Sequence, residues 1–223
     1  MKRLLTVCLV GLGLISFAAP ANALTYNLGG CDFTADGSAG SCGGSGADIP
    51  QNSLVMTFAQ TGSNLVTMTL DATNMSAGLG KISDVWFNVN GYTANQLSFT
   101  WVSGVKVNRN NGITAGGNVG NMGVFDIDFQ YKTSGKLGAF YYGEKSVYEI
   151  SSTTANLLTL NNFDAVSSDG FAAAFHLNNT GNGNSGHYTT TSTSAAPVPE
   201  PATMLLFGTG LVSLAGMARR KMQ

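Results

Sequence analysis

Alternation of apolar and polar residues with a period of two is the feature that most limits how this chain can fold. The clearest case is Val66, Met68 and Leu70, which are separated by polar residues. This period is typical of a half-buried antiparallel strand and does not suit a helix. Strands are expected at 54–59, 65–71, 84–90, 96–102, 104–108, 125–131, 146–150, 156–160 and 170–177.

Short breaks rich in glycine and asparagine separate these segments, as at 110–112, 115–118 and 121–123. Such residues tolerate the positive φ angles that hairpin turns require. No amphipathic helix of three turns is evident before residue 202. The pattern therefore predicts an all-β domain over 24–186, an antiparallel β-sandwich of jelly-roll-like form, followed by one C-terminal hydrophobic helix.

The first 23 residues have the form of a secretory signal peptide. Lys2 and Arg3 make a basic start, residues 4–17 are apolar, and Ala21-Asn22-Ala23 is a small-residue cleavage site. Signal peptides of this form are removed on export. The mature chain is therefore expected to begin at Leu24 and to lie outside the cytoplasm.

A second apolar segment, 202–218, lies near the other end of the chain and carries no charge. As a helix, its 17 residues would be about 25 Å long, slightly less than the bilayer core of about 30 Å. Arg219, Arg220 and Lys221 follow directly, and basic clusters stay on the cytoplasmic side. We expect a transmembrane helix that holds the precursor in the membrane, with a basic stop-transfer tail.

Pro199, Glu200 and Pro201 introduce that segment. The prolines fix φ and push the preceding residues toward extended conformations, so a protease would find this stretch accessible. The order of Pro-Glu-Pro, apolar segment and basic end over 199–223 resembles the PEP-CTERM sorting signal of exported bacterial proteins. The resemblance implies transient membrane residence, processing by an exosortase, and release or attachment at the cell surface in association with exopolysaccharide or biofilm. An ordinary tail anchor is the alternative.

Composition narrows the function of the exported part. Residues 24–196 carry 11 acidic and 6 basic side chains, a net charge of −5. With no basic stripe, nucleic acid is not an expected partner. Residues 187–198 are rich in Ser, Thr and Pro, which predicts a linker, either a plain spacer or a glycosylated stalk.

Two cysteines, Cys31 and Cys42, remain after signal cleavage. In an oxidising compartment they are expected to form a disulfide, which would contribute about 2–3 kcal/mol in the chain-entropy model. No C-x-x-C pattern and no nearby histidine accompany them. A metal site or a catalytic thiol is therefore not expected.

Chemistry has few candidate residues. His176 and His187 are the two histidines, and His176 is expected to be a structural residue at a sheet edge rather than part of a Ser-His-Asp site. A glycosidase needs two facing carboxylates, for which the pairs are Asp126 with Asp128 and Glu144 with Glu149. Paired acids on a strand more often serve solubility or weak calcium binding. No catalytic residue and no cofactor is predicted.

Aromatic side chains offer an alternative function without catalysis. Flat apolar faces stack on sugar rings, and the residues that would supply them are Trp86, Trp101, Tyr131, Tyr141, Tyr142 and Tyr148. The same residues would equally serve as core and cross-strand pairs. The sequence thus predicts a non-enzymatic surface or matrix protein, with a carbohydrate-binding module as the alternative and a secreted glycosidase as a weaker one.

Overall fold

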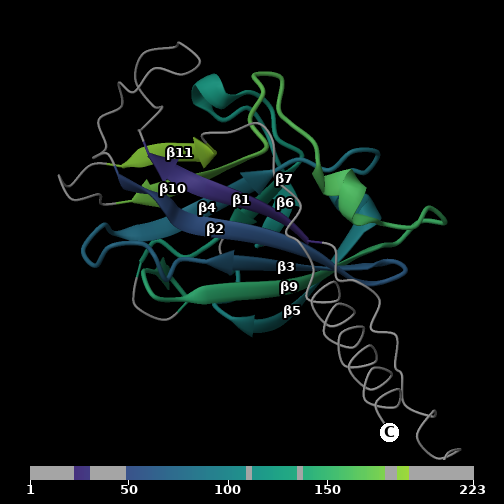
Figure 1. Ribbon diagram of the computed structural model, residues 1–223, viewed down its shortest axis with the longest axis horizontal. Coiled ribbons are helices and arrows are strands. Elements are labelled where there is room, and N and C mark those ends of the chain that lie inside the picture. The colour runs from purple at the N-terminus through teal and green to yellow at the C-terminus, as the bar shows by residue number, and fades with distance from the viewer. Residues whose placement is uncertain (1–22, 31–48, 109–111, 135–137, 179–184, 191–223) are drawn as a thin grey trace, which may run out of the picture. The chain divides into compact units, whose positions relative to one another are not determined.

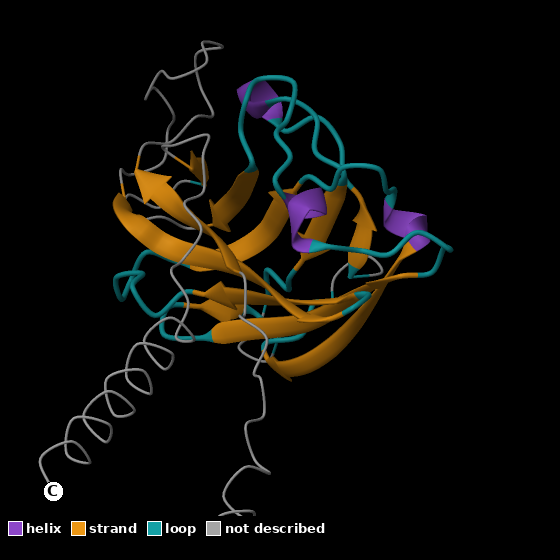
Figure 2. Ribbon diagram, turned by 45° about the vertical axis from the view of Figure 1, so that its right-hand side comes forward, coloured by secondary structure: helices purple, strands orange, loops and turns teal. Residues whose placement is uncertain are grey.

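The computed structural model describes residues 23–30, 49–108, 112–134, 138–178 and 185–190. All of them belong to one compact unit, Asn22–Val198. Their strands are β1 (Ala23–Gly30), β2 (Ile49–Gly62), β3 (Leu65–Asp71), β4 (Lys81–Phe87), β5 (Leu97–Gly104), β6 (Ile113–Ala115), β7 (Ile127–Gln130), β8 (Phe140–Tyr141), β9 (Lys145–Ser152), β10 (Ala173–Asn178) and β11 (Gly186–Thr190). Three short 3-10 helices, η1 (Ala94–Gln96), η2 (Gly120–Met122) and η3 (Leu160–Phe163), lie in the loops (Figure 2).

These strands form one antiparallel sheet in the order β5-β9-β3-β2-β1-β11-β10-β4-β7-β6, with β8 paired to β4 (Figure 1). The two ends of this order meet across the core. Phe129 of β7 lies 5.5 Å from Phe99 of β5 and 5.0 Å from Tyr148 of β9, measured between ring centroids. The all-β antiparallel class is confirmed, and the layered packing expected of a sandwich is made by a single curled sheet.

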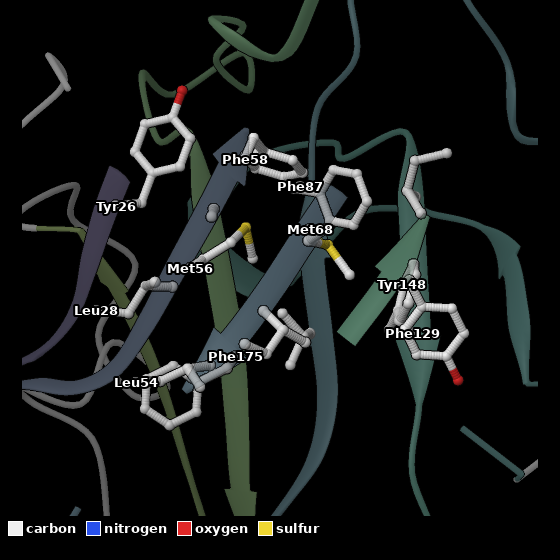
Figure 3. Packing of buried hydrophobic residues seen from close by; sticks show 14 of the residues in the cluster. Tyr26, Leu28, Leu54, Met56, Phe58, Met68, Phe87, Phe129, Tyr148 and Phe175 are labelled. Carbon is white, nitrogen blue, oxygen red and sulfur yellow. The ribbon is translucent and has the colours of Figure 1, made fainter. Parts of the chain in front are cut away.

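The core lies inside the curl and follows the alternation in the sequence. Met56, Phe58, Met68 and Leu70 are fully buried on β2 and β3, and their sequence neighbours Thr57 and Thr69 are not. Figure 3 shows Met56, Phe58 and Met68 among these core residues. The ring of Phe58 stacks on that of Phe163 of η3, with centroids 4.3 Å apart. Burial of a side chain of this size stabilises the fold by roughly 1.5–3 kcal/mol.

Two segments expected as strands are loops. The amide of Leu158 donates to Asn64 Oδ1 at 2.9 Å, and that of Leu160 donates to Gln60 Oε1 at 2.7 Å. Over 156–160, side chains of the β2–β3 hairpin thus accept the backbone amides that a neighbouring strand would otherwise accept. Over 104–108, only Gly104 belongs to a strand, because the amide of Val107 bonds to the hydroxyl of Tyr148.

Four of the described strands were not expected: the short strands β6 and β8, and the longer strands β1 and β11. β1 begins at Ala23 and lies between β2 and β11, inside the sheet. β11 contains His187, which the composition had assigned to a linker, and the prediction of a linker is wrong for 187–190. Tyr188 is fully buried and lies 5.4 Å from Phe175 on β10. Tyr188 is the one large apolar residue of β11, so a count of apolar residues does not reveal this strand.

Several predictions lie outside the described residues: the signal peptide, the Cys31–Cys42 disulfide, the linker from 191 to 198, and the hydrophobic helix at 202–218. Within the described ranges, no helix has the length and apolar character needed to cross a membrane.

Candidate functional site

The outer face of β4, β7, β10 and β11 gathers the polar side chains that the alternation turns away from the core. On β4, Val85 and Phe87 are core residues, whereas Asp84 and Trp86 point the other way. The strand register then lines up residues from separate strands. One row across the sheet contains Gln130, Asp84, His176 and His187, and the adjacent row contains Thr114, Asp128, Trp86, Ala174 and Thr189.

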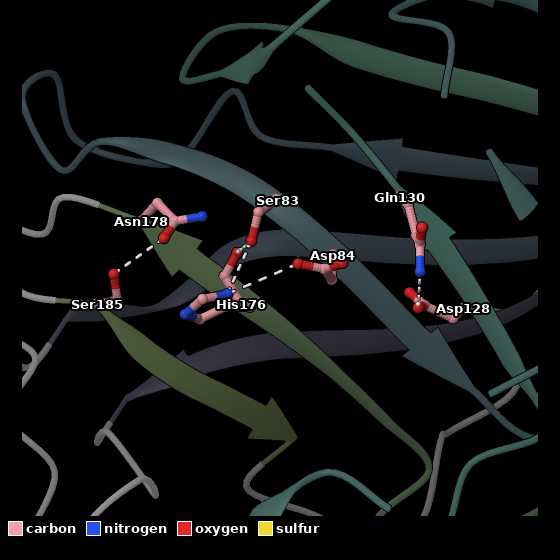
Figure 4. A network of polar contacts seen from close by, with 7 residues as sticks. All are labelled: Ser83, Asp84, Asp128, Gln130, His176, Asn178 and Ser185. Carbon is pink, nitrogen blue, oxygen red and sulfur yellow. Dashed lines mark hydrogen bonds and ion pairs between the residues drawn. The ribbon is translucent and has the colours of Figure 1, made fainter. Parts of the chain in front are cut away.

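His176 is held by a β-bulge rather than at a sheet edge. β10 lies between β11 and β4, and the register shift leaves both Ser83 and Asp84 opposite His176. Ser83 Oγ lies 2.8 Å and Asp84 Oδ2 lies 3.6 Å from the same atom, Nδ1 of His176 (Figure 4). In a catalytic triad the serine and the carboxylate contact opposite ring nitrogens. Ser83, Asp84 and His176 therefore form a row of polar contacts between β4 and β10, called the polar ladder below. The row lacks the geometry of a nucleophilic site.

The ladder continues to β11 through a stacked pair of imidazoles. The rings of His176 and His187 have centroids 4.4 Å apart and lie within 15° of parallel. On its other side, the ring of His187 lies 5.6 Å from that of Trp86. Among the described residues, no group of three His, Cys, Asp or Glu is placed to hold a metal ion.

A groove of about 490 Å³ opens beside this ladder. Its floor comes from β7, where Gln130 Nε2 donates a 2.6 Å hydrogen bond to Asp128 Oδ2 (Figure 4). Trp86 and His187 form one wall, Thr114 stands opposite Asp128 on β6, and the other wall is the segment 115–120.

That segment is fixed in place by a second, smaller core. Val119, Met122 and Phe125 pack with Trp86 and Ala174 on the outer face of the sheet. The carbonyl of Met122 accepts a 2.6 Å hydrogen bond from Ser167 Oγ. The groove is thus bounded by packed residues on the sheet side and on the loop side.

Three of the four carboxylates in the expected pairs make contacts that hold the fold, and the fourth, Glu149, lies on β9 between Thr67 of β3 and Thr100 of β5. Asp126 Oδ2 accepts the amide of Val89 at 2.9 Å, whereas Asp128 is buried on the groove floor beside Gln130. Glu144 Oε2 accepts the amide of Tyr141 at 2.7 Å in the turn after β8. Asp126 and Glu144 thus each accept a backbone amide, and Asp128 is bonded to a neighbour on its own strand.

The aromatic candidates divide into core and surface residues. Tyr131 and Tyr148 are core residues, and burial raises the pKa of both hydroxyls above the ordinary value. Trp101 and Tyr142 are 42% and 49% exposed, and Lys106 Nζ lies 5.9 Å from the Trp101 ring. Trp86 is 9% exposed, so its edge borders the groove and its ring is mostly covered.

Sequence reasoning missed Thr114 and Gln130 as site residues and interpreted 115–118 as a turn alone. The available signal was Asp128 and Gln130, two apart on β7, and Asp84 and Trp86, two apart on β4. Which strands are neighbours, and hence which pairs meet, depends on long-range register that the pattern does not contain.

The predicted sorting residues Pro199, Glu200 and Pro201, and the basic tail Arg219, Arg220 and Lys221, lie outside the described residues. Comparison with protein families finds the PEP-CTERM protein-sorting motif at residues 197–221. The chain carries this sorting motif. It implies export, a membrane-anchored precursor and processing by an exosortase. No curated protein and no solved structure matches the chain.

Proposed function

We propose that this chain is a non-enzymatic protein of the bacterial cell surface or extracellular matrix, delivered there by an exosortase and associated with exopolysaccharide. The PEP-CTERM motif at 197–221 is the observation that carries the proposal. An export signal at one end and a sorting motif at the other leave the β unit between them as the part that works outside the cell.

The described geometry supports a role without catalysis. Ser83 and Asp84 both approach Nδ1 of His176, so the ring has no nucleophile on one nitrogen and carboxylate on the other. Asp126 and Glu144 accept backbone amides. Each of these groups is used in positioning the chain, and a hydrolase would need at least two of them free to face a substrate.

A second candidate is carbohydrate binding, and the groove beside Trp86 favours it. Sites for small ligands are concave and combine apolar or aromatic walls with a few polar groups. An indole wall with Asp128, Gln130 and Thr114 has this composition. Binding to a matrix polysaccharide would retain the protein at the surface after the sorting segment is removed.

The intact mass of the native protein, recovered separately from the cell surface and from the medium, tests the main proposal. We expect a chain that starts at Leu24 and ends near Pro199–Pro201, with or without added mass, and that co-purifies with exopolysaccharide. Incubation with that polysaccharide should release no new reducing ends. A chain that still extends to Gln223, or a steady release of reducing ends, would overturn the proposal.

A further inference from the structure

We propose that the groove between Trp86, β7 and the segment 114–120 is a binding site for a neutral glycan. The inference rests on the proposed extracellular role and names the ligand class of this site. It is argued from three properties of the groove: its aromatic wall, its polar floor and its charge.

The aromatic wall is rigid. Trp86 packs with Val119, Met122 and Ala174 in the outer core, and this packing fixes the indole before any ligand arrives. A preorganised side chain loses little conformational entropy on binding, which favours affinity for a weakly interacting ligand such as a sugar. The part of the indole that remains exposed borders the groove together with the imidazole of His187.

The floor supplies polar groups from two strands. Gln130 Nε2 donates to Asp128 Oδ2 at 2.6 Å on β7, and Thr114 stands across from Asp128 on β6. A sugar hydroxyl both donates and accepts hydrogen bonds, and a carboxylate, an amide and a hydroxyl offer it partners of both kinds. Gln130 Oε1 is buried and accepts no hydrogen bond from any described residue. The Gln130 amide therefore has a hydrogen-bond acceptor left over at the groove floor.

Charge decides between classes of glycan. The described residues that line the groove include one carboxylate, Asp128, and neither lysine nor arginine. A polymer of uronic acids would place like charges together on the groove floor, which is unfavourable. A neutral hexose polymer carries the same hydroxyls without that repulsion.

Two neighbouring glycines make the site testable. A Cβ on Gly116 would overlap the backbone carbonyl of Phe125, whereas a Cβ on Gly117 meets no atom within 4 Å. Gly117 lines the groove. A larger side chain at 117 therefore occupies groove space without disturbing the packing behind it.

The experiment uses the full-length chain in mild detergent, with Trp101→Phe as the background. The chain has two tryptophans, so this variant leaves Trp86 as the single indole and its fluorescence reports on the groove. The probes are a neutral hexose oligomer, oligomers cut from the producing cells' exopolysaccharide, and a polyuronate oligomer. We expect saturable changes with at least one neutral probe and none with the polyuronate.

Added to that background, Gly117→Leu should abolish the response, and Asp128→Asn should weaken binding about tenfold, as loss of a hydrogen bond to a charged group does. The melting temperature of Gly117→Leu should equal that of the background, which separates occlusion from unfolding. Equal binding by Gly117→Leu, preference for the polyuronate, or no response to any probe would each overturn the groove assignment.

The last of these outcomes leaves the proposed function standing if the mass measurement still finds a processed surface protein. If the chain is found unprocessed to Gln223 while the groove binds a neutral glycan, the proposed localisation is wrong and the binding site still stands. The two proposals therefore fail by different measurements.

Discussion

At the scale of single residues, Gly116 and Gly117 show how neighbouring positions of the same type differ in what they permit. The amide of Gly116 donates to the carbonyl of Asp126 at 2.8 Å, so its Cα lies directly against the 125–126 backbone. Gly116→Ala should lower the free energy of unfolding by about 1–3 kcal/mol, because backbone atoms cannot move aside cheaply. Gly117→Ala should change it by less than about 0.5 kcal/mol. Urea titration of both variants provides the measurement, and equal stabilities would contradict the close approach.

Tyr131 gives a prediction for alkaline pH. Its hydroxyl donates to Ser146 Oγ at 2.8 Å, and Ser146 in turn donates to the carbonyl of Val105 at 2.7 Å. Complete burial raises the pKa of Tyr131 far above its ordinary value, with the Ser146 contact opposing the shift in part. The folded state therefore holds this proton more tightly than the unfolded state. Stability is full below about pH 10, the ordinary tyrosine pKa, and falls as the pH rises above it.

Above that pH, Tyr131 lowers the free energy of unfolding by about 1.4 kcal/mol per pH unit, and Tyr131→Phe should remove this contribution. At neutral pH it should cost only about 1 kcal/mol, the net worth of one hydrogen bond. Urea titrations between about pH 9 and 11, a range centred on the ordinary pKa, would show it as a shallower slope. Tyr142→Phe is the matched control, because this tyrosine is 49% exposed. An identical slope in Tyr131→Phe and the unmodified chain would contradict the burial of the hydroxyl.

At the scale of elements, the alternation in the sequence predicted the strands that face the core on one side, such as β3 with Val66, Met68 and Leu70. It failed for 156–160, where Leu158 is buried but its backbone bonds to the side chain of Asn64. Apolar spacing reports which side chains are buried and does not report what satisfies the amides. The groove was out of reach for a related reason, since Trp86 and Asp128 become neighbours only through the β4–β7 register.

β1 is the element with the sharpest consequence. It enters the sheet at Ala23, next to the expected cleavage site, and pairs with β2 from Ala23 to Leu28. Tyr26 is buried (Figure 3), and its hydroxyl donates to the carbonyl of Phe163 at 2.8 Å. A mature chain that starts at Asn27 lacks this anchor and the buried Leu24, and it should fail to give the cooperative thermal transition of a chain that starts at Leu24. Circular dichroism would decide, and equal transitions would show that β1 is dispensable.

At the scale of the whole molecule, folding and sorting use separate parts of the chain. The described strands all lie within Asn22–Val198, and the Pro-Glu-Pro tripeptide begins at Pro199. Changes to the tripeptide should therefore alter processing and leave the stability of the β unit unchanged. Changes to the core should lower the stability of the β unit. They leave processing unchanged only if unfolded chains still reach the exosortase.

The double substitution Pro199→Ala and Pro201→Ala tests this separation. Without the two prolines, residues 199–201 are free to join the following apolar segment as helix, and a protease that needs an extended substrate would lose its site. We expect the variant to be exported, to lose its signal peptide and to remain in the membrane fraction with a mass that runs to Gln223. Its β unit should melt at the temperature of the unmodified chain. Ser194→Ala, which lies outside the matched residues 197–221, should be processed normally. Normal trimming and release of the double variant would show that the tripeptide does not direct the cleavage, and the tail would then be an anchor with another route of removal.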